Sequence, residues 1–353
     1  MKEWCKPVLL GLPFLLLSCE KESPRSDAPK AAASSGEKAT ALDPDLAQAM
    51  AAASAAAPAQ PGTAAAGGPP ATGIFAPGAA DREVKKGDPP KLTLGNEGKE
   101  PRITLTPVQP KPGSKQSGII SVVQQQADGS GIPIEFAVTF EAQKPKADAA
   151  PTAPVPVTVK VTGAKIAVAG APKDLEATVA KLKGSKIDYE VAADGAGSNY
   201  RFELSKAAPA DLGDTIRSLS DVIAVVTVPF PDKPVGAEGF WMATSREGVL
   251  GLDLVTYRLI KVERIDGQKV TLNVNTKRYS ATPNFDLPGL QPGAPHSLAE
   301  FQALAQGTVE LVAGKGFPVG GNQNSSLRAQ LQDPANPRAR GMLQIDTQAE
   351  LKF

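Results

Sequence analysis

From about Arg102 onward, apolar residues recur at every second position, which is the pattern of strands with one buried face. Apolar and polar or small side chains alternate through residues 134–141, and residues 341–353 alternate over their whole length. The same spacing recurs in a run of valines: Val155, Val157, Val159 and Val161. The pattern therefore predicts a domain built mainly from antiparallel strands.

Turn signals indicate which strands are neighbours. Asp266-Gly267 supplies positive φ at low cost, so residues 252–265 and 268–280 are expected to form a hairpin. The Asp-Gly-Ser-Gly sequence at residues 128–131 predicts a second hairpin between the strands on either side of it. Strands that are joined this way meander through one sheet.

Helical spacing is credible in only two places, residues 172–183 and 211–222, the second carrying Leu212, Ile216 and Leu219 on one face. We also expect a short helical turn at residues 297–305, after His296. Two helices covering one side of an antiparallel sheet imply an α+β fold, mostly antiparallel β, with a curved meandering sheet and both helices packed on one face.

The order of turn, strand, hairpin and strand occurs twice, in residues 113–161 and in residues 236–280. Sequence identity between the two stretches is low. The repeated order is consistent with an internal duplication, and it does not by itself divide the region into two domains.

Residues 19–90 are rich in Ala, Pro and Gly and contain few large apolar side chains, among them Ile74 and Phe75. Such a segment buries too little surface to offset its chain entropy, so we expect a disordered tether. Residues 91–353 then form one β-rich domain. A chain beginning at Lys91 is accordingly expected to fold as stably as the longer one.

Residues 1–18 have the features of a secretory signal: Lys2 and Lys6, then an apolar run shorter than the roughly 20 residues of a membrane span. The run ends in Leu16-Leu17-Ser18-Cys19, which resembles the lipobox of bacterial lipoproteins. That resemblance implies that Cys19 becomes the mature N-terminus and carries a diacylglyceryl group and an N-acyl chain such as palmitate. Two or three acyl chains form a stable membrane anchor.

Glu20 follows the lipidated cysteine, at the position where aspartate in enteric lipoproteins directs retention in the inner membrane. By this resemblance we expect the chain to be anchored in the cell outer membrane, with its domain in the periplasm or at the cell surface. Residues 100–353 also resemble a group of uncharacterised secreted bacterial lipoproteins, through Pro229-Phe230-Pro231, Trp241 and Tyr257-Arg258-Leu259. That group implies no activity.

Charge and composition exclude several classes of protein. With 38 Lys and Arg against 37 Asp and Glu, the net charge is +1, which rules out nucleic-acid binding by bulk charge. One His and two Cys leave little room for zinc, haem or iron–sulfur sites, so we expect no metal and no other cofactor.

A catalytic set is equally hard to find. His296 has no histidine partner, the glycines at residues 314–321 lack the Lys-Ser/Thr pair of a phosphate loop, and Asp346 with Glu350 fits a solvated strand face. We therefore expect the protein not to be an enzyme.

Three functions remain open. The first is a lipid-anchored, non-enzymatic scaffold or assembly accessory of the envelope, with the membrane and another envelope protein as partners. The second is a carrier of a lipid or other apolar ligand, in a groove of the curved sheet lined by Trp241, Phe136 or Tyr257. The third is a hydrolase with an unrecognised site.

Overall fold

The computed structural model describes residues 70–105, 109–125, 131–144, 150, 153–249, 252–285, 296–333 and 336–353. Cys19 lies outside these residues, as do the signal and most of the expected tether. The turn at residues 128–130 also lies outside them.

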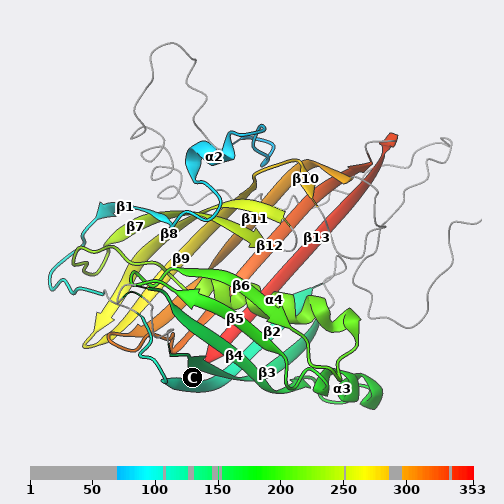
Figure 1. Ribbon diagram of the computed structural model, residues 1–353, viewed down its shortest axis with the longest axis horizontal. Helices are drawn as coiled ribbons and strands as arrows, with labels where there is room; N and C mark the ends of the chain where they lie inside the picture. Colours follow the sequence, from blue (N-terminus) through cyan, green and yellow to red (C-terminus); the bar gives the residue numbers. More distant parts are fainter. Residues whose placement is uncertain are drawn as a thin grey trace, which may run out of the picture.

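One strongly curved, open antiparallel sheet forms the body of the protein (Figure 1). The fold class predicted from the periodicity is therefore confirmed. The strands are β1 (Lys91–Asn96), β2 (Lys115–Gln125), β3 (Gly131–Ala142), β4 (Val155–Ile166), β5 (Lys186–Val191), β6 (Gly197–Glu203), β7 (Phe240–Val249), β8 (Leu252–Asp266), β9 (Lys269–Ser280), β10 (Asn284–Phe285), β11 (His296–Val312), β12 (Gly320–Asp333) and β13 (Asn336–Lys352).

The strand order, β1-β7-β8-β9-β11-β12-β13-β2-β3-β4-β5-β6, shows how the chain builds the sheet. Strands β2 to β6 follow one another, the chain then crosses to β7, and the later strands proceed to β13. The C-terminal strand β13 pairs with both β12 and β2 and so joins the two halves. Strands β1 and β6 are the two edges of this order.

The predicted hairpins fit this order. Strands β8 and β9 pair up to Asp266 and Lys269, and Gly267 between them has φ 59°. Strands β2 and β3 pair throughout. Two three-stranded meanders, β2–β4 and β7–β9, occupy the stretches with the repeated order, while the duplication itself stays a prediction.

Helices α3 (Lys173–Ala180) and α4 (Gly213–Val226) lie close to the predicted ranges, and α4 follows a 3₁₀ turn η1 (Ala210–Leu212). In Figure 1, α4 lies within the curve of the sheet. Both helices contribute to one cluster on the inward face of the sheet, which we call the main core. Its fully buried members include Leu219, Ile223, Leu182, Phe136, Trp241, Ile260 and Leu272.

The expected tether ends earlier than residue 90, because residues 75–84 pack on the opposite, outward face of the sheet. Helix α2 (Ala80–Glu83) lies in this segment. We call the resulting group the outer cluster; it consists of Phe75, Ala80, Val84, Met242, Val255, Tyr257, Leu259, Tyr279 and Ala281. The folded domain therefore includes residues that composition alone assigns to the tether.

Residues 72–75 also complete the sheet where β9 and β11 diverge. Phe75 N donates to Ser280 O at 2.8 Å, and Phe301 N donates to Thr72 O at 3.0 Å. Gly73 has φ +76°, and a Cβ there would lie 1.7 Å from Phe301 O, so only glycine fits. This close fit fixes the N-terminal segment between the two strands.

The helical turn expected at residues 297–305 is wrong, because these residues belong to β11. The pairing of β11 with β12 shifts between Leu298 and Glu300, which marks a bulge. The bulge places Leu298 and Phe301 in one cluster at a spacing of three, which imitates a helix. His296 is the first residue of this strand.

Candidate functional site

The structure separates the three residues that were expected to line a groove. Trp241 and Phe136 are fully buried in the main core, whereas Tyr257 belongs to the outer cluster. Trp241 pairs with Ile260 on β8, and Tyr257 lies three positions from Ile260, so the two aromatic rings face opposite sides of the sheet. They therefore do not meet in one groove.

Trp241 is a packing residue. Its indole Nε1 donates to Pro229 O at 2.8 Å, and its ring lies 5.8 Å from that of Phe230. Satisfying the indole N–H allows the whole side chain to be buried. Trp241 is therefore part of the main core and does not line a groove.

A seam remains where the curved sheet does not close. The segment 227–236, which leads from α4 to β7, lies along it and is fixed on both sides. Phe230 N donates to Asp194 O in the β5–β6 turn at 2.7 Å, and Ile103 and Val235 form a two-residue antiparallel bridge. The seam is thus bounded by edge strand β1, the β5–β6 turn and this segment.

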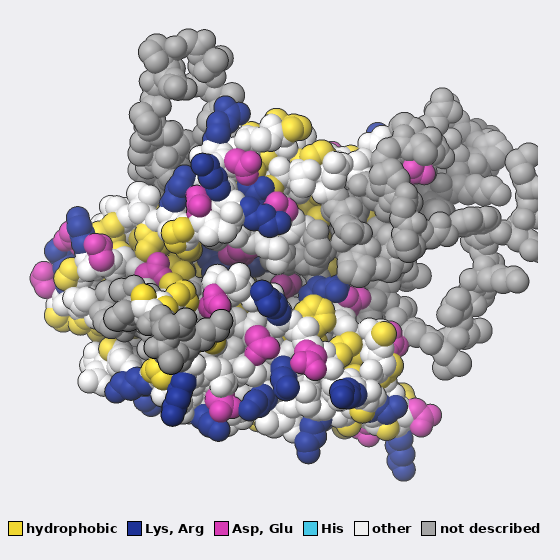
Figure 2. All heavy atoms as spheres, in the orientation of Figure 1, with side chains coloured by type: hydrophobic (Ala, Val, Ile, Leu, Met, Phe, Trp, Pro, Cys, Tyr) yellow, Lys and Arg dark blue, Asp and Glu magenta, His cyan; other side chains and the backbone are white. Residues whose placement is uncertain are grey.

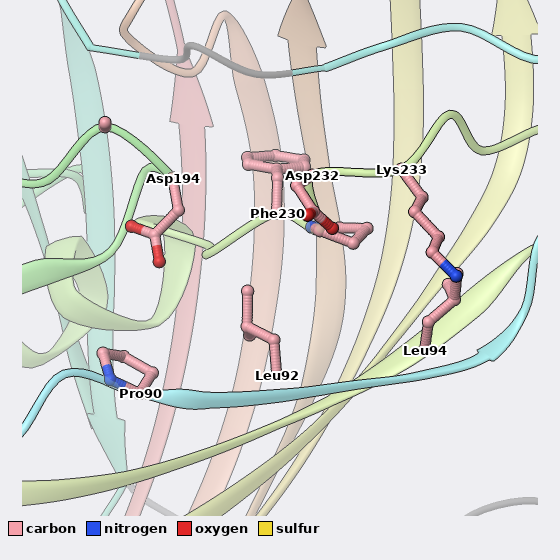
Figure 3. Close-up of a pocket in the computed structure, with 9 residues that line it drawn as sticks. Pro90, Leu92, Leu94, Asp194, Phe230, Asp232 and Lys233 are labelled. Atoms are coloured by element: carbon pink, nitrogen blue, oxygen red, sulfur yellow. The ribbon is translucent and has the colours of Figure 1, made fainter.

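An open groove of about 710 Å³ lies in the seam, and we call it the seam groove. In Figure 3, Leu92 and Leu94 rise from β1 toward the segment that carries Phe230, and Lys233 reaches across toward Leu94. The residues lining it are Pro90, Leu92, Leu94, Ala193, Asp194, Phe230, Pro231, Asp232 and Lys233. Most of them are apolar, and the charged ones are Asp194, Asp232 and Lys233.

Edge strand β1 gives the groove its apolar wall. Leu92 and Leu94 are half-buried and pack against the main core, while the intervening Thr93 is exposed. Asp232 and Lys233 are exposed at the rim. A ligand in the groove would meet aliphatic and aromatic side chains together with the half-buried side chain of Asp194, while Asp232 and Lys233 are exposed.

A second feature lies deeper on the inward face, and we call it the polar belt. The strand register aligns Ala243, Arg258, Thr276, Ala305, Ser325, Thr347 and Gln124 in one row across the sheet. The adjoining row contains Thr256 and Arg278. Several of these polar side chains are almost fully buried, with Thr256 at 0 %, Thr276 at 2 % and Arg258 at 5 % exposure.

Glu247 is the central acid of the belt. Arg258 Nη2 donates to its Oε1 at 2.7 Å, Thr256 Oγ1 donates to its Oε2 at 3.0 Å, and Ser245 Oγ donates to Oε1 at 2.8 Å. Burial alone would raise the pKa of Glu247, but Arg258 and Arg278 outweigh burial and hold it below its usual value. Glu247 is therefore a buried, charged carboxylate.

Asp221 on α4 behaves in the opposite way. Burial raises its pKa to about 6, and the negative charge of Glu247 raises it too, while Arg278 and Arg217 act against them. Burial also raises the pKa of the Tyr200 hydroxyl, which lies near the same charges. The belt thus contains one acid that is stabilised as an anion and one that is not.

The residues considered for catalysis do not come together. Asp346 accepts from Gln344 Nε2 at 2.6 Å, Glu350 pairs with Lys352 at 2.8 Å, and both lie on the polar face of β13. Within the described residues, no group of three or more His, Cys, Asp or Glu side chains could hold a metal ion. No helix in the same part of the chain is long and apolar enough to cross a membrane.

The surface is evenly charged. In Figure 2, basic and acidic side chains are interspersed over the visible face, in agreement with the net charge of +1. Within the part of the chain that the structure describes, the exposed large apolar side chains come from different parts of the fold. They are Ile119, Ile132, Val168, Phe202 and Met342.

Comparison with known protein families and with curated proteins gives no match to this chain.

Proposed function

We propose that this chain is a lipid-anchored, non-enzymatic envelope protein that carries an apolar ligand in the seam groove. The observation that carries the proposal is the groove itself, an open space of about 710 Å³ walled by aliphatic and aromatic side chains. Its volume falls within the roughly 300–1,000 Å³ range of small-molecule sites, which are mostly apolar with a few polar groups. A lipid acyl chain fits this chemistry.

The test uses an uncharged fluorescent probe, N-phenyl-1-naphthylamine, titrated into the mature protein. We expect saturable binding that Leu92→Gln weakens by about tenfold, because the amide would be buried against the ligand without a partner. Thr93→Gln is the matched control, since Thr93 is the exposed neighbour on the same strand. Absence of saturable binding, or equal loss in both variants, would overturn the groove proposal.

The anchor is proposed from the resemblance of Leu16-Leu17-Ser18-Cys19 to a lipobox. With Glu20 after the cysteine, we expect the domain at the periplasmic or outer side of the outer membrane. Cys19→Ala removes the acylated thiol and should release the protein from the membrane fraction after a carbonate wash. Cys5→Ala, within the predicted signal, should leave the protein in the membrane. Retention of the Cys19 variant would contradict the anchor.

A scaffold function is the second candidate, and the open sheet edges favour it. Strands β1 and β6 each pair on one side only in the strand order, and an extended segment of a partner could add to either. The two functions differ in what they leave in the purified protein. A carrier isolated from its own envelope should release a stoichiometric apolar compound on denaturing extraction, whereas a scaffold should release none.

A further inference from the structure

Three neighbouring side chains of the polar belt have polar atoms that are buried and unpaired. Arg258 Nε, Thr276 Oγ1, and Nε and Nη2 of Arg278 have no hydrogen-bond partner in the described part of the chain. The three residues are 5 %, 2 % and 7 % exposed. Buried donors without partners are uncommon and costly, so a cluster of them needs an explanation.

The strand register brings these atoms onto one site. Arg258 lies directly opposite Thr276 on adjacent strands, and Arg278 follows Thr276 by two positions on the same face of β9. Side chains opposite one another on adjacent strands have their Cβ atoms about 5 Å apart, within reach of a shared ligand. All three face inward, beneath α4 and its Asp221.

Glu247 does not satisfy this cluster. Its two oxygens already accept from Ser245, Thr256 and Arg258, and Arg278 Nε lies 3.8 Å from Oε2, beyond hydrogen-bond distance. Nε and Nη2 of Arg278 therefore remain available to another acceptor. The remaining acid nearby is Asp221, whose pKa is raised to about 6. Its carboxylate is disfavoured as an anion and therefore balances the charge of Arg278 poorly.

An apolar region borders the cluster on the same inward face, and we call it the inner apolar patch. Ala303 lies opposite Arg278, and Leu327 lies opposite Ala303. On β8, Leu254 is two positions before Thr256. The buried members of the patch are Leu252, Leu254, Leu298, Phe301, Ala303, Leu327, Ala329, Leu331 and Leu343.

We propose that Arg258, Thr276 and Arg278 form a binding site for one carboxylate or phosphate group. Two guanidinium groups and a hydroxyl donor match the several acceptor lone pairs of such an anion, and charged hydrogen bonds of this kind are strong. The group is either a free anion or the head of an amphiphile whose chain lies along the inner apolar patch. The site is distinct from the seam groove and does not depend on it.

The test compares two buried threonines in the belt. Thr276→Val removes the unpaired hydroxyl and preserves the side-chain shape, so without anion its thermal midpoint should equal or exceed that of the wild type. Thr256→Val is the matched control, because the Thr256 hydroxyl is bonded to Glu247 and does not belong to the site. Each protein is titrated with sodium phosphate and with dodecanoate, against sodium chloride at equal ionic strength and against dodecanol.

We expect a saturable rise of the wild-type midpoint with at least one of the two anions, weakened about tenfold by Thr276→Val and retained by Thr256→Val. Binding of dodecanoate but not of phosphate or dodecanol identifies an amphiphile head group, and binding of phosphate identifies a free anion. The proposal fails if neither anion acts beyond chloride, or if both variants lose the effect equally.

The seam groove is tested separately. Leu92→Gln should weaken binding of N-phenyl-1-naphthylamine about tenfold without changing the anion effect. Thr276→Val should weaken the anion effect without changing binding of the probe. Failure of the carrier proposal and failure of the anion site therefore give different results.

Discussion

The main core and the polar belt lie on the same inward face of the same strands, yet they differ in how their polar atoms are satisfied. Ile260 and Arg258 are two positions apart on β8, as are Val274 and Thr276 on β9. All four are buried. In the main core the indole of Trp241 finds Pro229 O at 2.8 Å, whereas the belt leaves several donors without a partner.

The difference shows which region stabilises the fold and which lowers its stability. Burying an apolar side chain contributes roughly 1.5–3 kcal/mol, and an unsatisfied buried donor costs about 1–3 kcal/mol. Unfavourable local features of this kind, here buried donors without hydrogen-bond partners, concentrate at functional sites. Packing under α4 therefore explains the stability of the sheet, and ligand binding explains the belt.

Strand β13 crosses both regions, so its removal gives the largest expected effect. Leu351 and Ala349 belong to the main core, Thr347 to the belt and Leu343 to the inner apolar patch. Deleting residues 341–353 also separates β12 from β2. We expect an insoluble or protease-sensitive product, measured by fractionation and limited proteolysis.

Asp346→Ala and Glu350→Ala are the controls for this deletion, because both side chains lie on the polar face of β13. Each should change the unfolding free energy by no more than about 0.5 kcal/mol. If either substitution destabilised the protein more than the deletion does, contacts on the outward face would be the ones that stabilise β13 in the sheet.

Trp241→Ala tests the main core alone. A fully buried Trp replaced by Ala leaves a cavity and typically costs about 3–5 kcal/mol, which chemical denaturation would measure. Thr276→Val in the belt should cost nothing. Equal losses at the two positions would remove the distinction between core and belt.

A chain beginning at Lys91 tests the outer cluster. This chain lacks Phe75 and Val84, whose side chains are 6 % and 1 % exposed in the full-length structure. It also lacks residues 72–75, which form backbone hydrogen bonds between β9 and β11. The loss should be about 3 kcal/mol or more, opposite to the expectation from composition. A chain beginning at Pro70 is the control and should retain the full midpoint in thermal unfolding.

Much of the fold follows from local pattern. Period-two spacing locates most strands, Asp266-Gly267 locates a hairpin, and Leu212, Ile216 and Leu219 locate α4, because each signal lies within a few residues. The packing of Phe75 could not be predicted, since an isolated aromatic in an Ala- and Pro-rich segment gives no periodicity. The start of β11 could not be predicted either, because the bulge between Leu298 and Glu300 interrupts the period-two spacing of the strand.

The candidate sites were less accessible to sequence reasoning. Aromatic size drew attention to Trp241 and Phe136, but large rings usually fill cores, as these do. Strand β8 contains a better signal. Thr256 and Arg258 stand at every second position between Leu254 and Ile260, where the alternating pattern predicts buried side chains. Two polar residues at such positions indicate a buried polar site. The seam groove depends on β1 pairing with β7 over a long separation, which no local pattern predicts.

Asp221→Asn is expected to give the smallest effect, and it distinguishes the two acids of the belt. The folded pKa of Asp221, about 6, lies above its ordinary value of 3.8, so its contribution is favourable in acid and is lost as pH rises through about 6. The variant should therefore gain stability at pH 8, by about 1 kcal/mol because solvent screens the partly exposed carboxylate, and little at pH 4.

Glu247→Gln should show the opposite sign. The pKa of Glu247 is held low by Arg258 and Arg278, so its contribution is present at neutral pH and fades as pH falls. Denaturation midpoints of both variants at pH 4, 6 and 8 would measure the two trends. If Asp221→Asn stabilises equally at every pH, its gain comes from packing, and the belt then has no acid whose charge is disfavoured. If it destabilises at pH 8, Asp221 is the permanent partner of Arg278, and the unpaired donors of that guanidinium no longer imply an external anion.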